Sequence, residues 1–199
     1  MAISLWAARM ERLLTEREES AMLLILPEVR RARLARVEKP EKRRDVLCAY
    51  TILQLALREQ YGWRGIPDIA LASMGKPFFP DFPTVHFNLS HSGGAVLVGV
   101  SDEPIGVDIE RIRPVSVRAM QRLAGVASEK AFYQSWVRRE ARAKRAGMGV
   151  GTLMGTESTL QAGEHFYYLD TFDGYVAGVA TRSEELPGKV RRYFLDDML

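Results

Sequence analysis

The sequence contains a single cysteine, Cys48, which excludes an internal disulfide bond. No apolar run reaches the length of a membrane span, and the N-terminus lacks the basic-then-apolar layout of a secretory signal. We therefore expect a cytoplasmic protein with no membrane partner. Cys48 itself lies among apolar residues, which favours a small buried side chain over a nucleophile.

The remaining composition is that of an ordinary globular protein. Of the 199 residues, 47% are hydrophobic and 27% are charged, which suits one large domain or two small ones. The net charge is only +3, but the basic residues are concentrated in two stretches. Residues 28–44 contain eight Lys or Arg and three acidic residues, and residues 138–145 contain five Lys or Arg and one acidic residue. Nucleic acid, a phosphorylated small molecule and an acidic protein are all suitable partners for such stretches, and a solvated helix face is the alternative.

Apolar periodicity predicts several helices. Thr15 and Glu18 form a capping box for a helix that ends before Pro27, and a short arginine-rich helix follows this proline. A long amphipathic helix is expected over residues 41–61, with its apolar residues on one stripe. Its first turn contains Arg43 and Arg44, where positive charge opposes the helix dipole, so we expect an anion nearby. Two further helices are expected, over residues 115–123 and from Ser128 to the glycines at positions 147, 149 and 151.

Alternation and turn residues predict the strands. They are expected over residues 2–8, 85–89 and 95–101, around Asp108, and as a hairpin within residues 165–181, with a tight turn over residues 91–94. One repeat bears on the architecture. His86-Phe87 and Gly99-Val100 recur at an offset of 79 as His165-Phe166 and Gly178-Val179. A chance match and a two-fold repeat of one α/β unit both explain this echo.

Two acids mark the strand at residues 106–110. Asp108 and Glu110 are expected on one accessible face of it, about 7 Å apart, while Val107 and Ile109 point into the core. Two such carboxylates repel each other unless a cation lies between them, and oxygen ligands suit a hard ion such as Mg²⁺. A solvated strand face is the alternative interpretation.

A line of side chains on the last helix holds a second acid. Phe132, Trp136, Glu140 and Lys144 follow one another at four-residue steps, so an apolar stripe continues into charged residues. Either the buried face runs into a polar pocket, or Glu140 and Lys144 form a surface ion pair.

Four motifs occur in a fixed order along the chain: GKP at residues 75–77, FNLSHS at 87–92, IGVDIE at 105–110 and W-x-x-x-E-x-x-x-K at 136–144. This set resembles that of the surfactin-type 4′-phosphopantetheinyl transferases, and the resemblance covers most of the chain. It implies an α+β fold of two similar α/β halves related by a pseudo-two-fold axis, in a monomer. The N-terminal half would span residues 1–110 and the C-terminal half residues 111–199.

The family moves the phosphopantetheine arm of coenzyme A to a serine of an apo acyl or peptidyl carrier protein and releases adenosine 3′,5′-bisphosphate. The resemblance implies that Asp108, Glu110 and Glu140 bind Mg²⁺, with Mn²⁺ as an alternative, and that Lys144 contacts the pyrophosphate. Coenzyme A would also be bound by a wider set, with its 3′-phosphate near Arg44 and His91. That set is Arg30, Arg31, Arg44, Lys76, Ser90, His91 and Lys144.

Phosphoryl transfer depends on positioning and charge neutralisation, so this residue set is sufficient for it. Glu140, directly or through metal-bound water, is the expected base for the carrier serine.

The sequence departs from the family at Arg139, where a lysine is usual, and over residues 122–135, which are shortened and lack a typical Phe-x-x-x-Glu, although Glu129 lies nearby. Two other readings are a non-catalytic relative that binds coenzyme A or a carrier protein, and a nucleic-acid-binding domain, which the acid pair disfavours.

Overall fold

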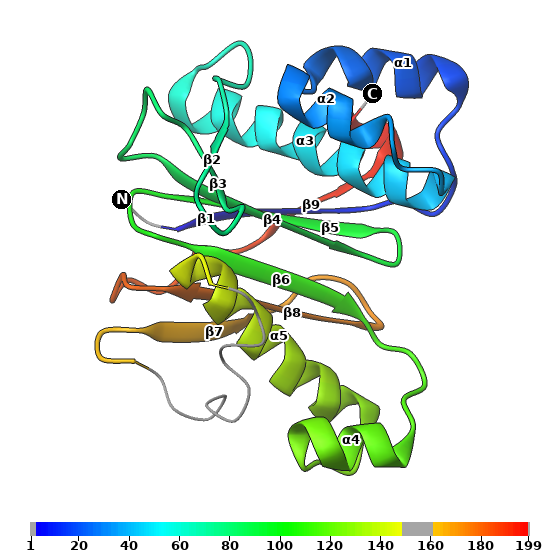
Figure 1. The fold of residues 1–199 in the computed structure, drawn as a ribbon, viewed down its shortest axis with the longest axis vertical. Helices are drawn as coiled ribbons and strands as arrows, with labels where there is room; N and C mark the ends of the chain where they lie inside the picture. Colours follow the sequence, from blue (N-terminus) through cyan, green and yellow to red (C-terminus); the bar gives the residue numbers. More distant parts are fainter. Residues whose placement is uncertain (1–2, 149–160, 199) are drawn as a thin grey trace.

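The computed structural model describes residues 3–148 and 161–198, and its helices and strands form a mixed α and β fold (Figure 1). A first sheet has the order β4-β5-β1-β9, and a second sheet has the order β6-β8-β7. The first consists of β1 (Ser4–Arg9), β4 (His86–Ser92), β5 (Ala95–Ser101) and β9 (Arg191–Phe194). The second consists of β6 (Gly106–Arg111), β7 (His165–Leu169) and β8 (Tyr175–Thr181). A short hairpin, β2 (Ala70–Leu71) with β3 (Pro77–Phe78), lies between α3 and β4.

The helices are divided between the two sheets. Three of them lie on the side of the first sheet and two on the side of the second (Figure 1). The first group is α1 (Glu16–Ile25), α2 (Glu28–Leu34) and α3 (Pro40–Tyr61), and the second is α4 (Val117–Ala124) and α5 (Glu129–Ala146). A 3-10 turn, η2 (Leu195–Met198), follows β9. None of the described helices is long and apolar enough to cross a membrane.

The helix starts confirm the capping predictions. Thr15 and Glu18 make both bonds of a capping box at α1, and the Ser128 side chain accepts from the Ala131 amide at the start of α5. Gly147 ends α5 in a left-handed conformation, as expected, whereas the glycines at positions 149 and 151 lie outside the described residues.

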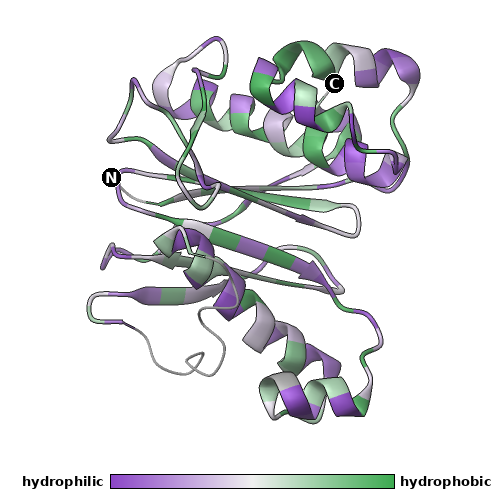
Figure 2. Cartoon of the chain, in the orientation of Figure 1, coloured by the Kyte–Doolittle hydropathy of each residue, from purple (hydrophilic) through white to green (hydrophobic). Residues whose placement is uncertain are grey.

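Two apolar cores result from this layering, and green strand and helix residues trace them in Figure 2. One fills the space between α3 and the first sheet, and the other lies between the facing sides of the two sheets. The buried surface of α3 is wider than the single apolar stripe predicted for this helix. Helix α1 and the turn η2 cover other sides of α3, so that all of residues 47–53 are buried. Cys48 is fully buried, and burial raises the pKa of its thiol to about 12, which confirms an inert core residue.

The two sheets repeat one order of elements. In each, a strand leads to a long helix and then to a hairpin whose second strand pairs antiparallel with the starting strand. Thus β1, α3, β4 and β5 correspond to β6, α5, β7 and β8. This order agrees with the sequence echo, while a two-fold axis relating the halves stays a prediction. The strand β6, assigned to the N-terminal half by the predicted boundary at residue 110, pairs within the second sheet.

The turn after β4 is tighter than predicted. The strand continues through His91 and Ser92, which pair with Val96 and Ala95, so only two glycines form the turn. Gly93 and Gly94 have φ angles of 55° and 86°, as a two-residue hairpin of the type I′ class requires. The predicted turn over residues 91–94 includes His91 and Ser92, and it is wrong for these two residues because their polar side chains belong to the strand.

A ladder of side chains joins the two sheets. Three alternate residues of β4 each accept a hydrogen bond from the β6 amide nineteen positions later in the chain. The bonds run from Val107 N to Asn88 Oδ1 (2.9 Å), from Ile109 N to Ser90 Oγ (3.3 Å) and from Arg111 N to Ser92 Oγ (3.4 Å). Because β6 is an edge strand, these side chains satisfy amides that would otherwise be unpaired.

Two lysines donate hydrogen bonds to backbone carbonyl oxygens at and beside the same edge strand. Lys76 Nζ donates to the carbonyl oxygens of Ile105 and Arg145, at 3.1 and 2.8 Å, and Lys144 Nζ donates to that of Val107 at 3.3 Å. We call this set of contacts between β4, β6 and the two lysines the seam. It fixes the segment that carries Asp108 and Glu110 against both halves of the fold.

Replacing Asn88 with alanine should lower the free energy of unfolding by about 1–3 kcal/mol, because the buried Val107 amide loses its acceptor. Urea unfolding of the purified protein measures this change. Gln54→Ala is the control, since its side-chain amide donates to a solvent-exposed carbonyl, that of Arg64, and should cost less than about 0.5 kcal/mol. Equal losses in the two variants would contradict the assigned role of Asn88.

Lys76 should make stability depend on pH above neutrality. Burial lowers the pKa of Lys76 to about 8 in the folded protein, from an ordinary 10.5. Between these values the unfolded chain binds a proton that the folded chain does not, so the free energy of unfolding rises with pH. The native protein should therefore gain stability relative to Lys76→Met from about pH 8 to 10.5. A difference that stays constant across this window would show that Lys76 titrates elsewhere.

Candidate active site

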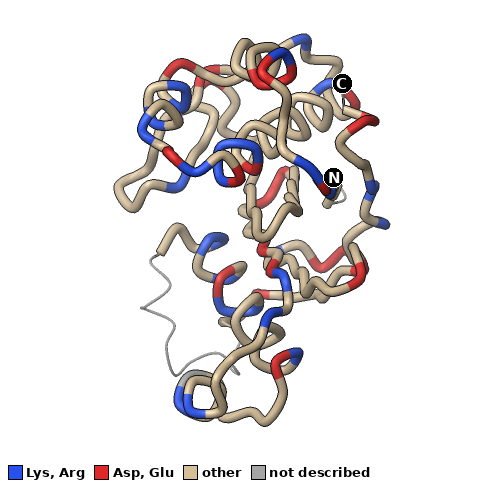
Figure 3. Tube along the Cα trace, turned by 90° about the vertical axis from the view of Figure 1, so that its right-hand side faces the viewer, with Lys and Arg blue, Asp and Glu red and all other residues tan. Residues whose placement is uncertain are grey.

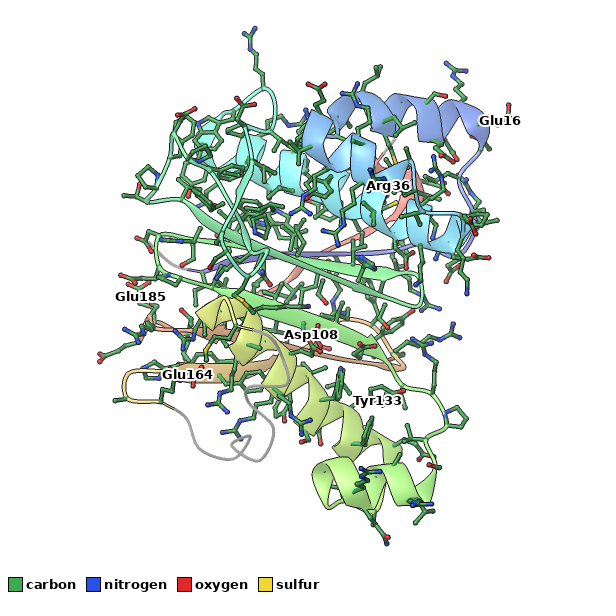
Figure 4. The ribbon with its side chains drawn as sticks, viewed as in Figure 1. Glu16, Arg36, Asp108, Tyr133, Glu164 and Glu185 are labelled. Atoms are coloured by element: carbon green, nitrogen blue, oxygen red, sulfur yellow. The ribbon has the colours of Figure 1, made fainter. Side chains whose placement is uncertain are left out.

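Asp108 lies at the centre of the site, on β6 beside α5 (Figure 4). It is only 3% exposed, so the expectation of an accessible strand face is wrong for this residue. The cause is the close approach of α5. A Cβ atom at Gly106 would lie 2.0 Å from the Ala141 carbonyl oxygen, so only glycine lets the helix cover this part of the strand.

The same approach brings Lys144 to Asp108. Its Nζ lies 2.7 Å from Asp108 Oδ1 and 2.9 Å from Ser90 Oγ, and it also donates to the seam carbonyl of Val107. Ser90 in turn donates to Asp108 Oδ1 at 2.7 Å. Its hydroxyl therefore makes one bond as a donor and two as an acceptor, which uses its full capacity.

Glu110 and Glu140 are the other two acids of the predicted metal site. Burial raises the pKa of both carboxyls, and repulsion from Asp108 raises each further. Glu110 also raises the pKa of Glu140, so the three carboxylates act on one another although α5 is distant from β6 in sequence. Ser92 Oγ donates to Glu110 Oε2 at 2.5 Å and orients this side chain.

The donor chemistry of these acids fits a hard divalent cation. Asp108 Oδ2 is buried and has no hydrogen-bond partner among the described residues, so one oxygen is left to ligate. A bound cation would also relieve the repulsion among the three carboxylates. Within residues 3–148 and 161–198, however, no three Asp, Glu, His or Cys side chains are already arranged to hold a metal ion. Lys144 supplies the positive charge beside Asp108 in this arrangement.

The line of residues on α5 ends in this polar region, as one of the two interpretations predicts. Phe132 and Trp136 stack with ring centroids 6.3 Å apart, and two turns later Lys144 contacts Asp108. Arg139, the departure from the family lysine, is 1% exposed, and its guanidinium lies 5.7 Å from the Trp136 ring centroid. The charged end of the line is therefore half-buried, with Lys144 turned towards Asp108.

A cavity of about 370 Å³ opens beside Lys144. It is bounded by α2, α3, the residues around Lys76 and β4, and its lining includes Arg30, Tyr50, His91 and Lys144. The Arg30 guanidinium lies 6.0 Å from the Tyr50 ring centroid, and its buried Nε has no hydrogen-bond partner in the described part of the chain. Cationic and aromatic groups in one cavity of this size suit a nucleotide.

The other predicted ligands either lie outside this cavity or have their polar atoms engaged within the protein. Arg44 lines a larger, more open cavity of about 860 Å³ at the β4–β5 turn, which shares His91 with the first cavity. Arg31 is exposed and donates to the Leu26 carbonyl. Lys76 is bonded to the two carbonyl oxygens of the seam, and the hydroxyl of Ser90 is engaged by Asp108.

Sequence reasoning missed the acids that neutralise the basic stretches. Arg142 and Arg145 are buried against Glu164, at 2.9 and 3.1 Å, so two of the five cations in the second stretch form a structural cluster. Arg43 pairs with Glu19 and Arg44 with Asp45, which accounts for these first-turn arginines without an external anion. Only the adjacent pair Arg44-Asp45 could have been noticed in the sequence, since Glu164 and Glu19 are remote from their partners.

No protein-family model matches the sequence, but curated relatives do. The 4′-phosphopantetheinyl transferase Sfp of Bacillus subtilis (strain 168) is 28% identical over 162 residues, covering 74% of this chain and 72% of Sfp. Another Bacillus subtilis 4′-phosphopantetheinyl transferase is 27% identical with the same coverage. The transferase AcpT of Salmonella typhimurium is 33% identical over 110 residues, covering 48% of this chain and 57% of AcpT. These relatives support an enzyme of the 4′-phosphopantetheinyl transferase class.

Proposed function

We propose that the protein transfers the phosphopantetheine arm of coenzyme A to a serine of an apo acyl or peptidyl carrier protein, with release of adenosine 3′,5′-bisphosphate. The observation that carries the proposal is the partly buried ion pair of Lys144 and Asp108 beside a nucleotide-sized cavity, with Glu110 and Glu140 near enough to act on Asp108 electrostatically. In addition, the named relatives are transferases of this class. The surfactin-type subclass, with a monomer of two pseudo-symmetric halves, is part of the same proposal.

The cavity beside Lys144 would take the adenosine end of coenzyme A. Tyr50 offers a ring face for the base, while Arg30 and His91 offer polar groups at the edge. From there the pyrophosphate can reach Lys144, which already lies between the cavity and Asp108. This lysine would stabilise the charge that develops on the pyrophosphate oxygen as the bisphosphate leaves.

Asp108, Glu110 and Glu140 would hold Mg²⁺, with Mn²⁺ as an alternative. When bound, the ion would supply neutralisation of the phosphate charge. Glu140 would also accept the proton of the carrier serine, because burial and the neighbouring acids raise its pKa towards the range of an effective base. Asp108 and Glu110 keep fixed positions, since Ser90 and Ser92 bind them from β4.

The surface charge is compatible with an acidic protein partner. The sequence has a pI of about 9.1, and Lys and Arg lie along the N-terminal helices (Figure 3), where Arg31, Arg33 and Arg36 are exposed. Opposite charges speed the encounter of two proteins. We propose a carrier protein as this partner, with no role for nucleic acid, and a cytoplasmic location.

Incubation with coenzyme A, Mg²⁺ and a panel of apo carrier proteins tests the function. Intact-mass analysis should show that a carrier gains the mass of one phosphopantetheine arm. A protein that binds coenzyme A but modifies none of the carriers would be a non-catalytic relative. A protein that does neither would have another function.

Asp108→Asn should lower kcat/KM for transfer by at least about a hundredfold, because it removes charge at the centre of the site while keeping the size of the side chain. The control is Asp81→Asn, an equal charge change at an exposed turn, which should leave the rate unchanged. Circular dichroism checks that both variants fold. Activity near the unaltered level in Asp108→Asn would contradict the proposed site.

A further inference from the structure

Asp45 lies between Arg44 and His91, the two residues that were expected to bind the 3′-phosphate. Its Oδ1 accepts from Nε and Nη2 of Arg44, at 3.0 and 2.7 Å. Its Oδ2 lies 4.0 Å from Nδ1 of His91. The Asp45 side chain is only 8% exposed, so water screens its charge weakly. A negative charge therefore already stands where the 3′-phosphate was expected.

Arg44 is fastened in place by its other contacts. Its Nη1 donates to the Arg12 carbonyl at 3.2 Å, which ties the start of α3 to the segment after β1. A Cβ atom at Gly94 would lie 3.2 Å from Nη2, so the β4–β5 turn closes over the guanidinium. Arg44 thus has a structural role, and Asp45 neutralises most of its charge.

His91 does not offset this negative charge. Burial lowers its pKa more than Asp45 raises it, so the imidazole is neutral at neutral pH. Lys42 and Lys144 act on His91 electrostatically, while Lys144 makes its direct contacts with Asp108 and Ser90. A phosphate that contacted both Arg44 and His91 would lie against the Asp45 carboxylate, and like charges at such distances repel strongly.

We propose that Asp45 is a specificity-determining residue that weakens binding of the 3′-phosphate, so that the protein distinguishes coenzyme A poorly from its 3′-dephospho form. This inference rests on the proposed function. It identifies the 3′-phosphate as the part of coenzyme A that contributes least to binding. Binding would depend mainly on the adenosine and pyrophosphate groups, in the cavity beside Lys144.

Calorimetry with two nucleotides tests the inference without any measurement of transfer. Adenosine 3′,5′-bisphosphate and adenosine 5′-monophosphate, each with Mg²⁺, are titrated into the unaltered protein and into Asp45→Asn, which keeps an oxygen for Arg44. The unaltered protein should prefer the bisphosphate by less than about tenfold. Asp45→Asn should raise that preference by about tenfold or more, since one buried negative charge is removed.

Two further variants make the result specific. Asp45→Ser removes the same charge with a smaller side chain and should also raise the preference. Glu41→Gln removes a negative charge from the same end of α3, at an exposed position that lines the larger cavity, and should change the preference by less than about twofold.

The inference is overturned if the unaltered protein prefers the bisphosphate by about tenfold or more, or if neither Asp45 variant changes the preference. If neither nucleotide binds the unaltered protein, the proposed function fails, and the inference fails with it.

Discussion

The hydrogen bonds between the side chains of β4 and the amides of β6 are the constraint on which the site depends. Asn88, Ser90 and Ser92 are spaced two residues apart, which matches the spacing of the amides that they bind. A shift of one residue in either strand would turn these side chains to the wrong face. The register of the seam therefore determines where Asp108 and Glu110 lie.

The seam also explains why charged groups can be buried here. Asp108 has the ammonium group of Lys144 and the hydroxyl of Ser90 as partners, and Ser92 partners Glu110. A buried carboxylate without such partners would cost several kcal/mol, of the order found for unpaired ions in proteins. On the other side of α5, Arg142, Arg145 and Glu164 form a second buried charge cluster. This cluster holds the end of the helix close to β7, so the position of Lys144 is supported from both sides.

Local signals in the sequence predicted local structure well. The capping box of Thr15 and Glu18, the cap at Ser128 and the strand over residues 95–101 are all confirmed, because each depends on neighbouring residues alone. The same reasoning could not predict that Gly106 admits α5 against β6, since the carbonyl that its missing Cβ would strike belongs to Ala141. It therefore left Asp108 on an exposed face.

Charge was predicted less well than secondary structure. The count of cations in residues 28–44 and 138–145 was correct, yet the partners Glu19 and Glu164 come from other elements and neutralise part of it. Lys76 and Ser90 were assigned to ligand binding by resemblance, and in this structure their polar atoms are engaged within the protein. Their roles towards coenzyme A stay predictions.

The strand β9 has a consequence for how the protein unfolds. It follows the second sheet in the chain, yet it lies parallel to β1 in the first sheet, with Trp6 opposite Arg191 and Arg9 opposite Phe194. The first sheet is thus built from both ends of the chain, and the second sheet with its helices lies between them in the sequence, over residues 106–181. Unfolding of residues 106–181 would free the connection to β9 and expose the core that the two sheets share, which favours a single cooperative transition over stepwise loss of two independent units.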